Sequence, residues 1–172
     1  MSKLSKIDSA AQNKGKGIET LWQFVKFIVV SLGAFVIQTF LPLLIKLPMS
    51  DAFLYKEFGF WIFESTAEVG LGIFIAANAS NVIAQIVSFF INREKTFNSS
   101  ANIAVTLPIY IIFTIALICF SAWLSPTLIT LLESKLGENV AISISGAICG
   151  AIQFFLYFPV DKLLFSKKKE SK

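Results

Sequence analysis

Four long apolar runs, almost free of charged residues, dominate this sequence of 172 residues. The hydrocarbon core of a bilayer is about 30 Å thick, so a helix needs about 20 apolar residues to cross it. Each run is close to this length or longer. The sequence therefore predicts an all-α membrane protein with four transmembrane helices, at about residues 21–45, 67–92, 103–124 and 140–158.

The positive charges predict the orientation of these helices, because cytoplasmic loops are enriched in Lys and Arg. Twelve of the 15 Lys and Arg residues lie in segments that share one side of the membrane, and the exceptions are Lys46, Lys56 and Lys135. We therefore expect both termini to be cytoplasmic. A flexible tail (1–20) and a basic tail (167–172) then flank the transmembrane domain (21–166).

The connections between the spans carry further signals. The longest connection, residues 47–66, mixes aromatic with charged residues, as is typical of the membrane interface. It predicts either a short helix in the outer leaflet or a compact loop over the outer end of the bundle. Proline disrupts a helix interior, so we expect Pro126 to end the third span and Pro159 the fourth.

Polar residues recur at helical spacing inside the second span. They follow one another at steps of three and four, so they fall on one face of a helix: Asn78, Asn81, Gln85, Ser88 and Asn92. On the fourth span, Gln153 shares a face with Tyr157 and two small residues, Gly146 and Gly150. Amides inside lipid are costly unless they face other helices or a hydrated cavity. These faces predict either hydrogen bonding between helices or a polar groove for a ligand.

The two halves of the chain resemble each other. Each half has a span going out, an acidic outer connection and a returning span that ends in a Phe-Phe pair, Phe89-Phe90 or Phe154-Phe155, followed by charged residues and another Phe. Both copies begin on the same side. We therefore expect two parallel hairpin repeats related by an axis along the membrane normal.

The residue inventory argues against catalysis. The chain has no His, and its two Cys residues lie inside apolar runs, where we expect buried free thiols. No familiar metal site, His-dependent nucleophile or Gly-rich phosphate loop can be built from these residues. We therefore expect no enzyme activity, no metal and no cofactor. The net charge of +4 follows from membrane topology, so no nucleic-acid partner is expected.

The end of the second span carries a short motif, Phe-Phe-Ile-Asn-Arg-Glu-Lys-Thr-Phe, at residues 89–97. Together with the opening Lys-Phe-Ile-Val-Val-Ser-Leu-Gly of residues 26–33, this motif resembles the GtrA-like family of small four-span membrane proteins over roughly residues 22–166. The resemblance implies a flippase of the bacterial cytoplasmic membrane. Its cargo would be a polyprenyl-phosphate-linked sugar used in cell-surface polysaccharide biosynthesis and teichoic acid glycosylation of the cell wall.

Under this resemblance, Arg93, Lys95 and Lys26 are candidate phosphate-binding residues at the cytoplasmic face. Arg can hold a phosphate in a two-pronged fork, and Lys adds a point charge. The polar stripe of the second span, with Gln153, would line the path of the sugar. Two departures from the family pattern favour the first repeat for this role: Lys95 stands where an aromatic residue is often found, and the second repeat has only Lys162. Arg93 can instead anchor the span to anionic lipid.

Two other functions remain open. A small proton-coupled drug exporter also has four spans, but it needs a carboxylate within the membrane. Inside the predicted span ends, the sequence offers only Glu68. The other alternative is a non-transporting partner that positions a membrane glycosyltransferase. A bundle of four helices is thin around any polar groove, which favours a homodimer.

Overall fold

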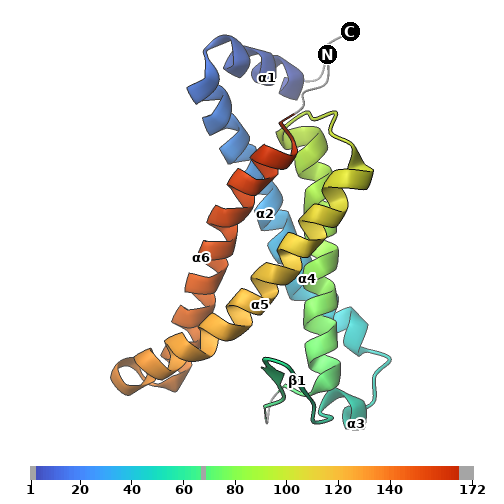
Figure 1. Ribbon diagram of the computed structural model, residues 1–172, viewed down its shortest axis with the longest axis vertical. Helices are drawn as coiled ribbons and strands as arrows, with labels where there is room; N and C mark the ends of the chain where they lie inside the picture. Colours follow the sequence, from blue (N-terminus) through green and yellow to red (C-terminus); the bar gives the residue numbers. More distant parts are fainter. Residues whose placement is uncertain (1–2, 67–68, 167–172) are drawn as a thin grey trace.

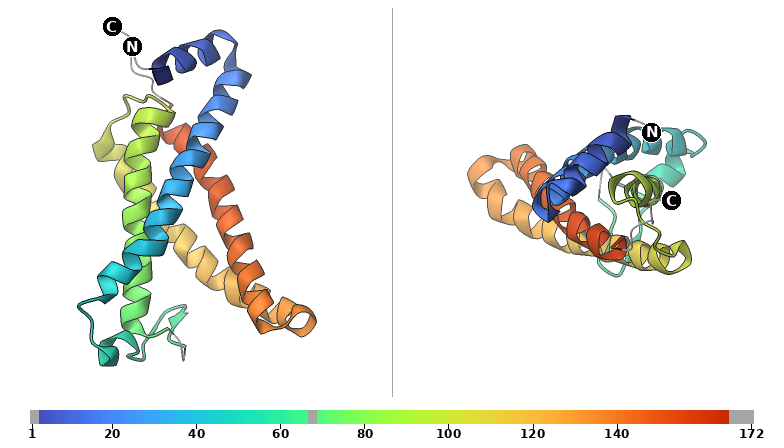
Figure 2. Two further views of the ribbon diagram at one scale, coloured as in Figure 1. Left: turned by 180° about the vertical axis from the view of Figure 1, so that it is seen from behind. Right: turned by 90° about the horizontal axis from the view of Figure 1, so that it is seen from above.

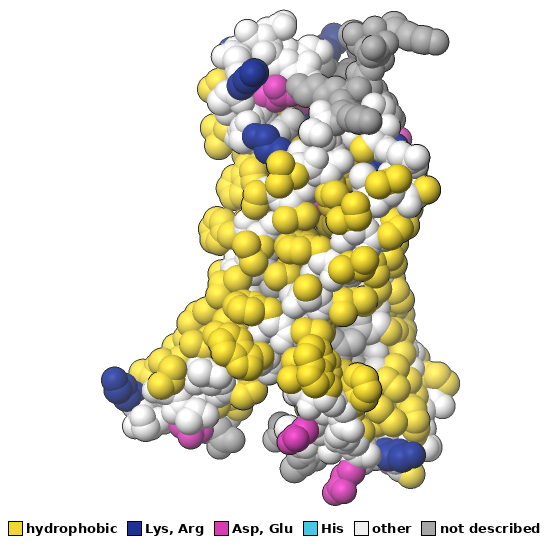
Figure 3. Space-filling view, viewed as in Figure 1, with side chains coloured by type: hydrophobic (Ala, Val, Ile, Leu, Met, Phe, Trp, Pro, Cys, Tyr) yellow, Lys and Arg dark blue, Asp and Glu magenta, His cyan; other side chains and the backbone are white. Residues whose placement is uncertain are grey.

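The computed structural model describes residues 3–66 and 69–166. Within these residues, four helices are long and apolar enough to cross a membrane. Their apolar side chains form a broad belt between two charged ends (Figure 3). This confirms the prediction of a mostly helical protein with four helices that can span a membrane. The four helices are α2 (Lys16–Lys46), α4 (Leu71–Ile91) with its π-helical extension η1 (Asn92–Thr96), α5 (Ile103–Leu136) and α6 (Glu138–Leu164).

The long helices pack as two pairs. α2 lies along α4, and α5 lies along α6, whereas the two pairs share fewer contacts with each other. The pairs meet at the end that holds α1 and lean apart toward the end that holds α3 (Figures 1 and 2). We call these the α1 end and the α3 end. The molecule is therefore joined firmly at one end only.

Aromatic side chains join the two pairs near the α1 end. Phe89 of α4 lies 5.1 Å from Phe165, which directly follows α6, and 5.2 Å from Tyr110 of α5, measured between ring centroids. Phe27 of α2 packs on Phe158 of α6 at 5.4 Å. Ring pairs in these tilted and edge-to-face geometries contribute about 0.5–1.5 kcal/mol each beyond their buried area. This cluster is the hydrophobic core of the protein.

The amino-terminal segment differs from the predicted flexible tail. Residues Lys3–Asn13 form helix α1, and α2 already begins at Lys16. Ala11 of α1 is buried, and the Asp8 carboxylate is bound by two side chains of α2. These contacts come from residues up to 18 positions away, so local composition did not indicate them. The predicted basic tail, 167–172, lies outside the described residues.

The long connection forms a compact loop at the α3 end, and no outer-leaflet helix of useful length occurs in its described part, residues 47–66. It contains the four-residue helix α3 (Asp51–Leu54) and a two-stranded antiparallel sheet, β1 (Gly59–Phe60) and β2 (Phe63–Glu64). The rings of Phe58 and Phe63 pack on Phe74 of α4. A Cβ at Gly72 would lie 2.8 Å from the Leu54 backbone, so glycine lets the loop sit directly on α4.

Both prolines that were expected to end spans lie inside helices. α5 continues past Pro126 to Leu136, and α6 continues past Pro159 to Leu164. A proline removes one backbone donor, but neighbouring hydroxyls can satisfy freed carbonyl groups in membrane helices. One turn of side-chain bonding lies next to Pro126, where the Thr127 hydroxyl donates to the Trp123 carbonyl at 3.2 Å. As a result, Asp161 lies within α6 rather than in a tail after it.

Candidate functional site

A cavity of about 340 Å³ lies among the four long helices. We call it the groove. Its polar lining comes from every long helix and from η1. The side chains that supply this lining are Ser31, Gln38, Gln85, Ser88, Asn92, Tyr110, Gln153 and Tyr157. None of the residues that line the groove is charged, so it can solvate hydroxyl groups without holding an ion tightly.

The mouth of the groove is apolar and reaches the outer surface of α2. Leu32 and Phe35 line the groove, yet they are 61% and 64% exposed. In a bilayer, side chains at this depth face lipid tails. The groove therefore joins a polar interior to the lipid phase, and it can receive a molecule that has a polar head and an apolar tail.

The predicted polar stripe, which runs along α4 into η1, is divided among three roles. Gln85, Ser88 and Asn92 line the groove. Asn81 accepts a hydrogen bond from the Gln38 amide of α2 at 2.9 Å, so it joins the first helix pair. Asn78 does not line the groove; its amide donates to the Phe74 carbonyl one turn earlier, at 2.9 Å.

The groove residues also bond helices to one another. The Tyr110 hydroxyl donates to Gln85 Oε1 at 3.0 Å, linking α5 to α4. On the other side, the Gln153 amide donates to the Ser121 hydroxyl at 2.7 Å, linking α6 to α5. Among the described residues, Gln85 uses only its oxygen in this way, so its amide N–H groups remain available to a bound group. The same side chains thus serve both as links between helices and as groove lining.

Arg93 lies at the start of η1, next to Asn92 in sequence. Its guanidinium Nε and Nη2 both donate to the Ala101 carbonyl, at 3.0 and 2.7 Å. The Ser99 amide in turn donates to the Arg93 carbonyl at 2.8 Å. Arg93 therefore closes the turn between η1 and α5 with one edge of its fork. It is not among the residues that line the groove.

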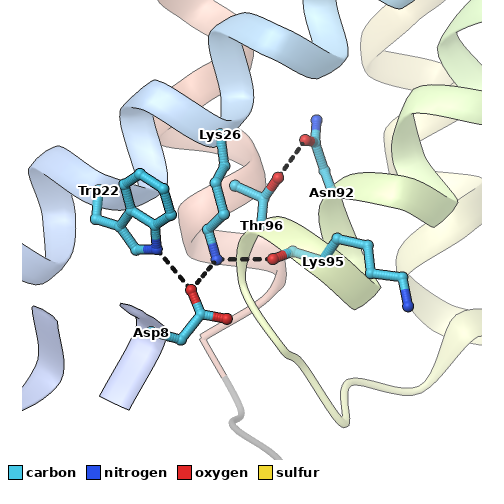
Figure 4. A network of polar contacts seen from close by, with 6 residues as sticks. All are labelled: Asp8, Trp22, Lys26, Asn92, Lys95 and Thr96. Atoms are coloured by element: carbon cyan, nitrogen blue, oxygen red, sulfur yellow. Dashed lines mark hydrogen bonds and ion pairs between the residues drawn. The ribbon is translucent and has the colours of Figure 1, made fainter. Parts of the chain in front are cut away.

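Lys26 and Lys95 meet in a polar network at the α1 end (Figure 4). The Lys26 ammonium donates to Asp8 at 3.0 Å and to the Lys95 carbonyl at 2.7 Å. The same Asp8 oxygen accepts from the Trp22 indole at 2.6 Å. Lys26 is thus already neutralised and ties α1, α2 and η1 together. Lys95 contributes only its backbone to this network, and its side chain is exposed.

Sequence reasoning missed Asp161. Its carboxylate is fully buried in α6 and accepts a hydrogen bond from the Asn92 amide at 2.8 Å. The Thr96 hydroxyl donates to the other end of the same amide, Asn92 Oδ1, at 2.9 Å. The signal was present, because Gln153, Tyr157, Asp161 and Phe165 follow one another at steps of four. This spacing was not extended to Asp161 because Pro159 was expected to end the helix.

The four long apolar helices are typical of a multi-pass membrane protein, and the groove is a polar site that opens beside exposed side chains of α2. Comparison of the chain with family models, curated proteins and solved structures gives no match. Within residues 3–66 and 69–166, no cluster of His, Cys, Asp and Glu side chains has the size needed to hold a metal ion.

Proposed function

We propose that this protein translocates a polyprenyl-phosphate-linked sugar across the bacterial cytoplasmic membrane. The product would serve cell-surface polysaccharide biosynthesis or teichoic acid glycosylation, as the resemblance to GtrA-like proteins implies. One observation carries the proposal: the groove is polar and uncharged inside, and its mouth is formed by the lipid-exposed side chains of Leu32 and Phe35.

This pattern suits the chemistry of the cargo. A sugar head presents many hydroxyl groups, and amide side chains both donate to and accept from them. Gln85 and Gln153 supply such amides from opposite helix pairs. The polyprenyl tail requires no binding site, because it can remain in lipid outside Leu32 and Phe35. A neutral lining also avoids trapping the phosphate halfway across.

The distribution of charge supports an orientation with the α1 end in the cytoplasm. Most Lys and Arg residues belong to segments on this side, including Arg93 and Lys95. The packing pairs α2–α4 and α5–α6 coincide with the two hairpins proposed as parallel repeats. In this orientation the phosphate would first meet η1, where the exposed Lys95 ammonium and the remaining N–H groups of Arg93 are available. Lys26, already bound to Asp8, would act as a supporting charge.

A second function is favoured by a separate observation. Gly146 and Gly150 of α6 are exposed, and a Cβ on either would meet nothing within 4 Å. A helix of another protein can approach such a surface closely. That helix would belong to a second copy of this chain or to a membrane glycosyltransferase. In the second case this protein would position the glycosyltransferase without transporting anything itself.

Asp161 supplies the intramembrane carboxylate that the sequence had not offered to a drug exporter. It is, however, fully buried and does not line the groove, whereas an exporter of cations needs a carboxylate that its cargo can reach. We therefore keep the lipid-linked sugar as the proposed cargo.

The decisive experiment uses liposomes that contain only the purified chain and a polyprenyl-phosphate sugar. Movement of the sugar between leaflets, absent from protein-free liposomes, would support the flippase. Lack of movement with well-folded protein would overturn it. Movement that appears only when a glycosyltransferase is added would favour the partner function.

A further inference from the structure

The Asp161 carboxyl group lies in an enclosed site between the groove and the α1 end. Its neighbours on the same face of α6 are Tyr157 one turn before and Phe165 one turn after, and both are buried. Oδ2 accepts from Asn92, and Oδ1 has no hydrogen-bond partner. Within the described residues, Oδ1 is the only buried side-chain oxygen or nitrogen that lacks a hydrogen-bond partner.

Within residues 3–66 and 69–166, no cation is paired with this carboxyl group. From η1, the uncharged Asn92 faces it, supported by Thr96. The hydroxyl-bearing rings of Tyr110 on α5 and Tyr157 on α6 are its titratable neighbours. The nearby cations are bound elsewhere: Arg93 to Ala101, Lys26 to Asp8 and Lys162 to the Thr20 hydroxyl at 2.7 Å.

A buried carboxylate with one hydrogen bond and no counter-ion is costly, so such a group takes up a proton instead. We propose that Asp161 is a proton-binding site, occupied in the arrangement described here and emptied when α6 moves away from η1. On release, the O–H bond at Asp161 breaks, the carboxylate keeps the electron pair, and the proton passes to water that enters the parted site.

Asn92 connects this proton to the groove. Its side chain lines the groove and also donates the single hydrogen bond that Asp161 receives. A bound sugar that engages the Asn92 amide competes with Asp161 for it, and removal of that bond changes the affinity of Asp161 for its proton. Proton binding thereby becomes coupled to cargo binding. This coupling rests on the proposed function, whereas the proton site itself does not.

The proton site is tested by infrared spectroscopy of the purified, membrane-reconstituted protein at neutral pH. We expect the carbonyl stretch of a protonated carboxyl group in the wild type and its loss in Asp161→Asn. Asp51→Asn, which changes an exposed carboxylate of α3, should retain the band. A second variant, Asp161→Ser, gives the same readout if Asp161→Asn does not fold. A wild type without the band, or a band that persists in the folded Asp161 variants, would overturn the proposal.

The coupling is tested by imposing a pH gradient on the liposomes. We expect the gradient to change the rate of sugar movement in the wild type and to have no effect in Asp161→Asn. Equal responses of the two proteins would overturn the coupling. If the wild type moves no sugar at any pH, the proposed function fails, and the infrared result alone decides whether Asp161 holds a proton.

Discussion

The side-chain amide of Asn92 donates to the Asp161 carboxylate at 2.8 Å and so joins residues 69 positions apart in the chain. The bond links η1, at the end of the first helix pair, to α6 of the second pair. The bond lies near the α1 end, beside the aromatic core that also joins the two pairs, so it helps to hold the pairs together. Asn92 and Asp161 therefore contribute to the stability of the protein and form the proposed proton site.

Asn92→Ala should destabilise the protein by about 1–3 kcal/mol, because it leaves the buried Asp161 and Thr96 groups without their partner. Thermal unfolding in detergent measures the effect. Asn78→Ala is the matched control, since Asn78 bonds only a carbonyl of its own helix. That control should change stability by no more than about 0.5 kcal/mol. Equal losses in the two variants would contradict the role assigned to the Asn92–Asp161 bond.

Gly150→Leu should block the groove without unfolding the protein. Gly150 lines the groove, and a Cβ there would meet nothing within 4 Å, so the added side chain has room to enter the polar space. We expect sugar movement in liposomes to be lost, with the melting temperature retained.

Gly146→Leu is the control for this variant. Gly146 is one turn away, equally open, but not part of the groove lining. Full movement in Gly146→Leu, with loss in Gly150→Leu, supports the groove. Equal loss in both would indicate that this face of α6 binds another helix.

Arg93→Ala should loosen the turn between η1 and α5, because two guanidinium nitrogens hold the Ala101 carbonyl. Hydrogen exchange of the Ser99 amide, which donates to the Arg93 carbonyl, should become faster. Arg93→Lys keeps the charge but lacks the fork, so it should protect the amide only in part. Unchanged exchange in Arg93→Ala would refute this structural role. A loss of sugar movement with unchanged exchange would instead favour direct phosphate binding.

Asp8→Ala should release α1 from α2. Asp8 binds both Trp22 and Lys26, but the site is only partly buried, so the cost should be about 1 kcal/mol or less. The measurement is quenching of Trp22 fluorescence by a soluble quencher, in a background with Trp61→Phe and Trp123→Phe. Quenching should increase in Asp8→Ala and stay unchanged in Asn13→Ala, on the exposed side of the same helix. No increase would mean that other contacts hold α1.

The helical, membrane-spanning architecture was predictable because bilayer thickness fixes the apolar length of each span. The inward position of Gln85, Ser88 and Asn92 was also predictable, because lipid offers no hydrogen bonds to amides. Asn78 shows the limit of this reasoning. An amide can satisfy itself on the carbonyl one turn earlier, and helical spacing alone does not distinguish this case from a place in a groove.

The remaining differences have tertiary causes. Helix α1 is held by Trp22 and Lys26, which lie outside it, so its own composition indicated a flexible segment. Asp161 followed a proline and resembled a residue of a cytoplasmic tail. It is buried because α6 continues through Pro159 and because Asn92, distant in sequence, supplies a partner.

From Ile103 to Leu132, helix α5 contains no charged residue. At about 1.5 Å per residue, this part of the helix is about 45 Å long, against a hydrocarbon core of about 30 Å. Such an excess is accommodated by tilt, in agreement with the oblique course of α5 in Figure 1. Because α6 packs along α5, we expect a thinner bilayer to incline both helices further from α2 and α4, and a thicker bilayer to make them steeper. The thickness of the host membrane would then set how far the two helix pairs stand apart.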